Sequence, residues 1–233
     1  MLEVTVKTWQ DFRDTLLRFA QLDRDRRNQW WFRGQGQFRH DLVPTIDRNQ
    51  RFANDRERDA FISVLLSEYR REVTRLGVGQ PLPTGDAFEL LARHHGLPGP
   101  LLDWTRSPYV AAFFAFIDGN PSADGSVAIF ALDRARVDPN ALDPDIPQVE
   151  FVDEPELVQF NQRALQQRGV FLRRSQARRR LEDVLGGALT KFRLPAEEKP
   201  AALADLDQMM VNATTLFYDL ESAARTVLWR CSN

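Results

Sequence analysis

The sequence predicts an α+β fold, with helices packed around a central group of strands in a single domain over residues 1–233. Helical patterns dominate the first half of the chain, whereas strand patterns gather between residues 126 and 195. This order differs from the regular alternation of a parallel α/β fold. The size of the chain agrees with a single domain, because 233 residues that are 43% hydrophobic can bury one sizeable core. No repeat and no long Pro/Gly-rich linker divides the chain.

Start signals mark the helices of the first half. Thr8 and Asp11 resemble a helix N-cap pair ahead of an apolar stripe. Asp86 caps a helix that ends at Gly96, and Pro108 takes the first position of another. The elements expected there are a strand at 3–7, a helix after Thr8, a strand at 30–34, and helices at 55–76, at 86–96 and from 108.

Apolar runs and alternating patterns mark the second half. Asp219 precedes a helical pattern and is expected to be its N-cap, with a role of Asp219 or Glu221 in a site as the alternative. The expected elements are strands at 126–132, 148–153, 169–174 and 189–195, and helices at 155–166, 200–211 and 216–229.

The stretch WWFRGQGQ at 30–37 places a cation directly after three aromatic residues. The aromatic run favours a buried strand, so Arg33 is expected to emerge at its end. Gly34 and Gly36 then allow another molecule to approach the backbone closely, or simply make a turn.

A second polar group stands between two helical patterns, in LARHHGLPGPLLDWTRSPYV at 91–110. His94 and His95 close one helix, and Asp103 and Thr105 precede the next. Polar side chains beside a helix N-terminus suit an anion-binding site. The alternative is structural: histidines complement the dipole of a last helical turn, and Asp103 or Thr105 acts as a cap.

Charge and composition bound the class of protein. The net charge is −2, which gives no overall attraction to nucleic acid. The run RRSQARRR at 173–180 is either a solvated surface or a contact to a nucleic-acid backbone. No apolar run is long enough for a membrane span and no signal peptide is recognised, so a cytoplasmic protein without membrane contact is expected. The single Cys231 offers no disulfide framework, and the three histidines lack metal-site spacing, so no metal site is expected.

These motifs in this order resemble the FRG-domain family, named for its Phe-Arg-Gly motif. The resemblance covers nearly the whole chain. It departs from the family at Gly99-Pro100, where members often carry Thr-Arg, and at Tyr218, where they carry proline. The residues that carry it are Phe32–Gln35, His94–Pro98, Leu101–Thr105, Ser107-Pro108, Ala111, Phe114-Ala115, Arg163, Gln167, Gly169, Phe171 and Leu216–Glu221.

A weaker similarity is to the ADP-ribosyltransferase superfamily, which implies a core of mostly antiparallel strands and NAD as substrate. In those enzymes an arginine after an aromatic residue holds the NAD phosphates or ribose, as Arg33 would. Their next strand ends in Ser-Thr-Ser, where this chain has Asp103 and Thr105. A late strand supplies a glutamate that stabilises an oxocarbenium-like cation. Gln167 stands at that point here, and it brings no negative charge.

The resemblance implies a role for each candidate residue. Arg33 anchors the pyrophosphate through bidentate bonds. His94 or His95 positions a ribose hydroxyl or acts as a base. Asp103 orients a histidine or stabilises the cation, with Gln167 beside it. Trp104 stacks on nicotinamide or is a core residue. The expected catalytic residues are Arg33, His94, His95, Asp103 and Gln167, and those that bind NAD are Arg33, Gly34, Gln35, Trp104 and Thr105.

Three functions stay open at this point. The first is an NAD-dependent ADP-ribosyltransferase or NAD glycohydrolase that modifies nucleic acid or protein, in the manner of a bacterial toxin or phage-defence effector with an antitoxin or regulatory partner. The second is a module that binds a nucleotide or nucleic acid without catalysis. The third is a metal-dependent nuclease.

Overall fold

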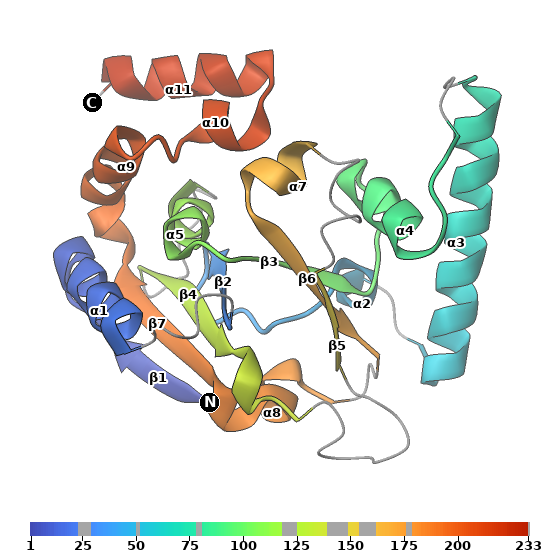
Figure 1. Cartoon of the computed structure of the whole chain (residues 1–233), viewed down its shortest axis with the longest axis horizontal. Coiled ribbons are helices and arrows are strands. Elements are labelled where there is room, and N and C mark those ends of the chain that lie inside the picture. Colours follow the sequence, from blue (N-terminus) through green and yellow to red (C-terminus); the bar gives the residue numbers. More distant parts are fainter. Residues whose placement is uncertain are drawn as a thin grey trace.

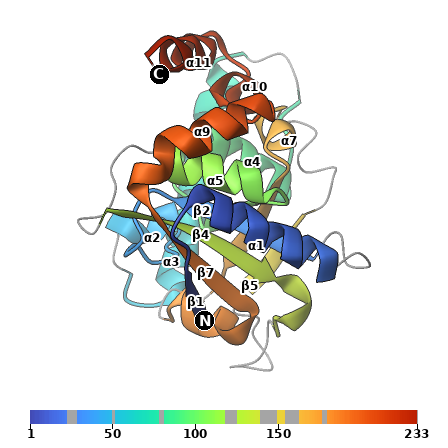
Figure 2. The same cartoon turned by 90° about the vertical axis from the view of Figure 1, so that its left-hand side faces the viewer.

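The computed structural model shows an α+β fold built on a seven-stranded mixed sheet (Figures 1 and 2). The structure describes residues 1–22, 29–49, 52–77, 81–117, 125–138, 149–153, 162–175 and 179–232. The strand order is β1-β7-β4-β2-β3-β6-β5; β1 and β7 are parallel, and the other neighbours are antiparallel. The strands are β1 (Leu2–Thr5), β2 (Trp30–Gln35), β3 (Leu101–Thr105), β4 (Ser126–Asp133), β5 (Val149–Val152), β6 (Gly169–Arg174) and β7 (Leu189–Pro195).

Most of the expected helices form. Thr8 and Asp11 cap the first helix reciprocally, since each side chain accepts a hydrogen bond from the other residue's backbone amide at 3.1 Å. None of these helices is long and apolar enough to cross a membrane, as far as the described residues go. The helices are α1 (Trp9–Leu22), α2 (Thr45–Asn49), α3 (Asp55–Arg75), α4 (Gly85–His94), α5 (Pro108–Ile117), α7 (Gln162–Gln166), α8 (Leu181–Leu185), α9 (Lys199–Gln208), α10 (Ala213–Phe217) and α11 (Leu220–Ser232).

The predicted strands at 169–174 and 189–195 match β6 and β7 residue for residue. Of the helix expected at 155–166, α7 forms the last turn, and residues 154–161 lie outside the described part of the chain. Helices α2 and α8 were not predicted, because five residues are too short to display a helical period.

Hydrophobic clusters cover both faces of the sheet. On one face, α1, α5, α9 and α10 pack over residues such as Phe32 and Phe192 (Figure 2). The opposite face holds Trp31, Trp104 and Phe130 beneath α8. Alternation along each strand sends neighbouring side chains to opposite faces, so Trp31 and Phe32 enter different clusters.

The sheet is divided at its centre. β2 pairs with β4 over six positions, and β3 pairs with β6 over five. Between β2 and β3 the register contains one pair, Phe32 opposite Thr105. The strands therefore separate beyond this point, which divides the sheet into a β1-β7-β4-β2 half and a β3-β6-β5 half. Residues 33–35 of β2 and 101–103 of β3 lie on the two sides of this division.

Candidate functional site

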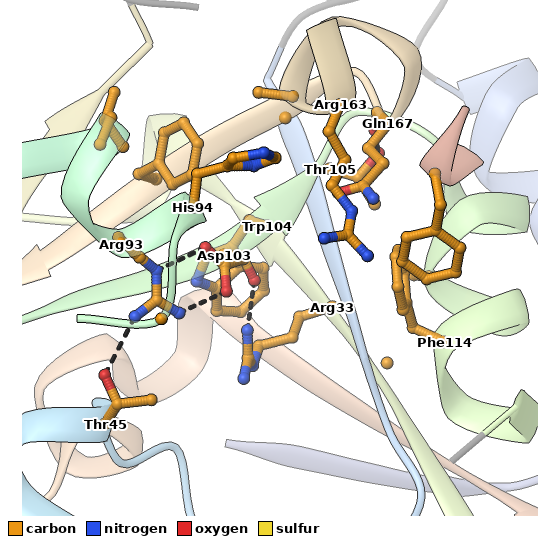
Figure 3. A pocket seen from close by; sticks show the side chains of 18 of the residues that line it. Arg33, Thr45, Arg93, His94, Asp103, Trp104, Thr105, Phe114, Arg163 and Gln167 are labelled. Atoms are coloured by element: carbon orange, nitrogen blue, oxygen red, sulfur yellow. Dashed lines mark hydrogen bonds and ion pairs between the residues drawn. The ribbon is translucent and has the colours of Figure 1, made fainter. Parts of the chain in front are cut away.

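A cavity of about 640 Å³ lies where β2 and β3 separate (Figure 3). This volume is typical of small-molecule sites, which span roughly 300–1,000 Å³. Four arginines line it, and Asp103 is the single carboxylate among its described lining residues. The charged and polar lining side chains are Arg33, Thr45, Arg48, Arg93, His94, Asp103, Thr105, Arg163 and Gln167, and the aromatic ones are Phe32, Trp104, Phe114, Phe171 and Phe217.

One wall of the cavity is held together by an ion pair between α4 and β3. Arg93 donates from Nε to Oδ1 of Asp103 at 2.8 Å and from Nη2 to its Oδ2, a bidentate arrangement. Arg93 also donates from Nη1 to Oγ1 of Thr45 at 3.1 Å, which links this wall to α2. Arg33 reaches across from β2 and donates from Nη1 to the backbone oxygen of Asp103 (Figure 3). The wall is therefore fixed in place before any ligand binds.

Asp103 is a carboxylate stabilised in its charged form. Burial alone would raise its pKa, but the charges of Arg93, Arg33 and Arg48, with the hydrogen bonds from Arg93, lower the pKa below its usual range. Its side chain is 53% exposed, into a cavity that the protein surrounds. Two roles were expected for Asp103, to orient a histidine or to stabilise a cation. Its described hydrogen bonds do not support the first role, because the last turn of α4 brings Arg93, rather than His94, to the carboxylate.

The opposite wall comes from α7 and α10. The guanidinium of Arg163 lies 4.1 Å from the centre of the Phe217 ring, and Phe114 of α5 meets that ring edge-on at 5.8 Å. Gln167 follows α7 and donates from Nε2 to the backbone oxygen of Leu216 at 3.2 Å. Arg163, Gln167 and Phe114 surround the same opening in Figure 3. This wall joins a cation to two aromatic rings.

The two histidines have different surroundings. His94 lines the cavity, whereas His95 follows the helix and is exposed outside it. Their rings meet edge-on, with centres 4.9 Å apart. Burial lowers the pKa of His94, and the charges of His95 and Arg163 lower it further. An imidazole with a lowered pKa is neutral at pH 7, so His94 can accept a proton there.

Gly34 is required for packing of the fold. A Cβ atom at this position would lie 1.9 Å from the backbone oxygen of Ala111 and 2.6 Å from the backbone nitrogen of Ala115. Helix α5 thus packs directly on the β2 backbone, and the glycine admits this helix rather than a ligand. Gln35 lies beyond it and lines a neighbouring cleft instead of the cavity.

Thr105 and Trp104 belong to the frame of the site. Thr105 is buried, donates to the backbone oxygen of Gln167 at 2.7 Å, and accepts from the Ser107 amide at 3.0 Å. It ties β3 to the segment before β6 and shapes the entry to α5. Trp104 is 3% exposed and packs in the cluster around Trp31, as a core residue does.

The neighbouring cleft, about 710 Å³, shares Arg33, Gly34 and Arg48 with the cavity. Arg39 and His40 also line it. Its two carboxylates take part in ion pairs with residues outside the cleft, Asp41 with Arg180 and Asp47 with Arg58.

Asp219 and Glu221 hold structural contacts. Asp219 accepts from the backbone amide of Ser222 at 2.7 Å and caps α11, as predicted. Glu221 pairs with Arg225 one turn later. Neither residue lines the cavity.

The described part of the basic run at 173–180 is tied into the fold. Arg173 contacts three carboxylates, Asp86, Glu89 and Glu150, at 2.6–2.8 Å. Arg174 is buried. Residues 176–178 lie outside the described part of the chain. Where the structure describes the chain, no group of three His, Cys, Asp or Glu side chains could hold a metal ion.

Sequence reasoning brought Arg33, His94, Asp103 and Gln167 to one site, and the structure places all four around the cavity. It missed Arg93. Arg93 directly precedes His94 on α4, and its pairing with a residue ten positions later had no local signal. Arg163 and Phe217 were part of the family pattern, but no role was assigned to either.

Comparison with known proteins supports the first resemblance. Residues 28–124 match the model of the FRG domain. No curated protein matches the chain, and neither does any solved structure. The matched span extends past α5 and includes the cavity residues Arg33, Arg93, His94 and Asp103. The chain thus carries an FRG domain over residues 28–124, and the wall formed by Arg163 and Phe217 is added from outside that span.

Proposed function

We propose that the cavity binds NAD and that the protein transfers the ADP-ribose group to an acceptor. One observation carries this proposal: three motifs far apart in sequence line one cavity at the division of the sheet. Arg33 comes from β2, Asp103 from the adjacent β3, and Gln167 from the segment leading into β6. The order of these motifs is the order in which the ADP-ribosyltransferase resemblance places its arginine, its second strand and its late acidic position.

The charge of the cavity suits a dinucleotide. Four arginines against one carboxylate favour an anion, and arginine forms bidentate bonds to phosphate oxygens. Phe114 and Phe217 offer aromatic surface for a base or a nicotinamide ring. A ligand with both phosphates and planar rings satisfies both features.

The proposed reaction uses Asp103. The bond between C1′ of the nicotinamide ribose and the nicotinamide nitrogen breaks, and its electron pair leaves with nicotinamide. The ribose then carries positive charge, which the Asp103 carboxylate stabilises. An acceptor oxygen or nitrogen attacks C1′ and loses a proton, for which neutral His94 is the available base. Water as acceptor would make the protein an NAD glycohydrolase, and a nucleic acid or protein acceptor would make it a transferase. By family resemblance, we place such an acceptor in a toxin or phage-defence setting.

A non-catalytic nucleotide-binding module is the second candidate. The observation that favours it is the bidentate pair, because both oxygens of Asp103 are already bonded to Arg93. Gln167, at the position of the expected glutamate, has its amide directed to the Leu216 backbone. In a binding module, Arg33 and the two walls of the cavity are needed to bind the nucleotide, and Asp103 serves to hold Arg93 in place.

The test is nicotinamide release from NAD, with labelled ADP-ribose followed into protein, DNA and RNA. We expect release by the wild type in the presence of EDTA, and none by Arg33→Ala. Asp103→Asn should lower kcat by about 10²–10³-fold if the carboxylate stabilises the cation. Arg71→Ala is the matched control, because Arg71 is an exposed arginine of α3 paired with Glu68.

Three outcomes separate the candidates. Release that EDTA leaves intact and that Asp103→Asn slows by about 10²–10³-fold supports the transferase or glycohydrolase. Saturable NAD binding without release, lost in Arg33→Ala and kept in Arg71→Ala, supports the binding module. Nucleic-acid cleavage that EDTA stops, with no NAD binding, would replace both with the nuclease.

A further inference from the structure

We infer that Arg163, with Phe217 and Phe114, forms a phosphate subsite on the α7–α10 wall of the cavity, opposite the wall that holds Asp103. The subsite would take the pyrophosphate of a nucleoside diphosphate or of ADP-ribose. The identity of the full ligand rests on the proposed function, whereas the phosphate chemistry rests on the residues of the wall themselves.

The surroundings of Arg163 differ from those of the other described arginines at the cavity. Arg93 donates to a carboxylate, Arg33 to a backbone oxygen, and Arg48 to the backbone oxygen of Val43 at 3.2 Å. Arg163 is half-buried and lines the cavity, yet within the described residues its guanidinium donates no hydrogen bond and has no carboxylate within ion-pair distance. Figure 3 shows its side chain extending from α7 into the opening.

A partly buried cation without a close counter-ion is unfavourable in the empty protein. Burial lowers the pKa of Arg163, and the charges of Asp219 and Asp103 oppose this only from a distance. A bound anion would supply the missing counter-charge. An arginine hydrogen-bonded to a ligand phosphate also gains the strength of charge-assisted bonds.

Phe217 fixes the orientation of this cation. The guanidinium carbon lies over the Phe217 ring, 4.1 Å from its centre, and Phe114 meets that ring edge-on. The N–H groups that point away from the ring stay available for oxygen acceptors. The residue is therefore held for bidentate binding of a phosphate.

The two walls together set the direction of the ligand. Among the residues that the structure describes, the single carboxylate of the cavity, Asp103, lies on the α4–β3 wall, and the cation without a close counter-ion, Arg163, lies on the α7–α10 wall. Phosphates would turn toward Arg163, with Arg33 reaching them from β2. The ribose that becomes positively charged would turn toward Asp103. Arg163 is thus a binding residue that selects phosphate and orients the sugar.

The experiment is isothermal titration calorimetry of wild type, Arg163→Gln, Arg163→Lys and Arg225→Ala with ADP-ribose, ADP and adenosine. Arg225 is the control, because it is an exposed arginine of α11 paired with Glu221. We expect Arg163→Gln to raise the Kd for ADP-ribose and ADP at least tenfold and to leave any adenosine binding unchanged. Arg163→Lys keeps the charge without the planar guanidinium, so its Kd for ADP-ribose should lie between those of the wild type and Arg163→Gln. Thermal melting shows that each variant is folded.

Three results would overturn the inference. The first is equal Kd values for ADP-ribose in wild type and Arg163→Gln, and the second is a parallel loss of adenosine binding, which would mean that Arg163 only shapes the cavity. The third is a wild type that binds neither ADP-ribose nor ADP. The proposed reaction can fail independently of the phosphate subsite. If ADP and ADP-ribose bind through Arg163 but NAD releases no nicotinamide, the subsite is supported and the proposed enzymatic activity is refuted.

Discussion

Arginines do different things in two regions of this molecule. Beside β6 and α3 they are structural: Arg58 is buried and donates to both oxygens of Asp47 at 2.7 and 3.0 Å, and Arg173 meets three carboxylates. At the α7–α10 wall, Arg163 faces a cavity with an aromatic ring beneath it and no close carboxylate among the described residues. The first region contains the conspicuous basic run, and the second contains a single unremarkable arginine.

A cluster of cations in the sequence therefore does not by itself mark a binding site. Cations are available to bind a ligand only where the fold does not bring carboxylates to them. Arg173 begins the basic run, and its partners come from α4 and β5. Its charge is therefore already neutralised inside the protein. At the cavity, the fold brings no described carboxylate close to Arg163, so a bound anion would supply its counter-charge.

The largest effect on stability is expected for Arg58→Ala. This change leaves Asp47 buried without its main cation, and breaking a buried pair in this way costs about 3–5 kcal/mol. We expect the low end, because Nη1 of Arg174 lies 3.8 Å from Oδ2 of Asp47 and compensates in part. Urea denaturation measures the change, with Arg71→Ala as the surface control. A loss below about 1 kcal/mol would mean that the first region is not structural.

A smaller effect is expected for Asp103→Asn, which breaks the pair with Arg93. The carboxylate is half exposed, so the change should cost about 1 kcal/mol at pH 7. The folded pKa of Asp103 is lowered, so its stabilisation is present above the unfolded pKa of about 4 and is lost as pH falls through the folded value. Unfolding measured from pH 7 to pH 3 should therefore show the two proteins converging at acid pH. A constant difference would contradict this assignment.

The smallest effect on stability is expected for Arg163→Gln. The residue has no close counter-ion among the described side chains, so its loss should change the free energy of unfolding by less than about 0.5 kcal/mol. The same denaturation series compares it directly with Arg58→Ala. If Arg163→Gln unfolds the protein as readily as Arg58→Ala does, the contrast between the two regions is void.

The imidazole of His94 reports on the same arginine. The charge of Arg163 helps to lower the pKa of His94, so Arg163→Gln should move that pKa back up toward its ordinary value. A histidine with a lowered folded pKa disfavours folding as pH falls below about 6.5, and the variant should soften this acid penalty. Histidine NMR titration of the wild type and the variant measures the shift. An unchanged His94 titration would place Arg163 too far away to act on the cavity.

Much of the fold could be predicted from the sequence, because strong local patterns determine it. The apolar runs gave β6 and β7, and the cap residues Thr8 and Asp219 marked the starts of α1 and α11. Division of the sheet could not be predicted, because it depends on strand pairing between β2 and β3, about 70 residues apart. Nor could the packing of α5 on Gly34, which gives this glycine a structural reason.

Half of the candidate site could be predicted in the same way. Arg33 and Asp103 stand in distinctive motifs, so they were found. Arg93 gains its role through a contact ten positions along the chain, and Phe217 through a contact with Arg163 of a different helix. Arg163 gains its role because none of the carboxylates in the described part of the chain lies within ion-pair distance of it. Local sequence patterns do not indicate the contacts of Arg93 and Phe217 or the lack of a carboxylate near Arg163.

The most direct test is a crystal structure of the protein with ADP-ribose. We expect the ligand in the cavity between β2 and β3, with its pyrophosphate bonded to Arg163 and Arg33 and its terminal ribose toward Asp103. ADP-ribose in the neighbouring cleft beside Arg39 and His40, or in the cavity with its phosphates turned away from Arg163, would contradict it.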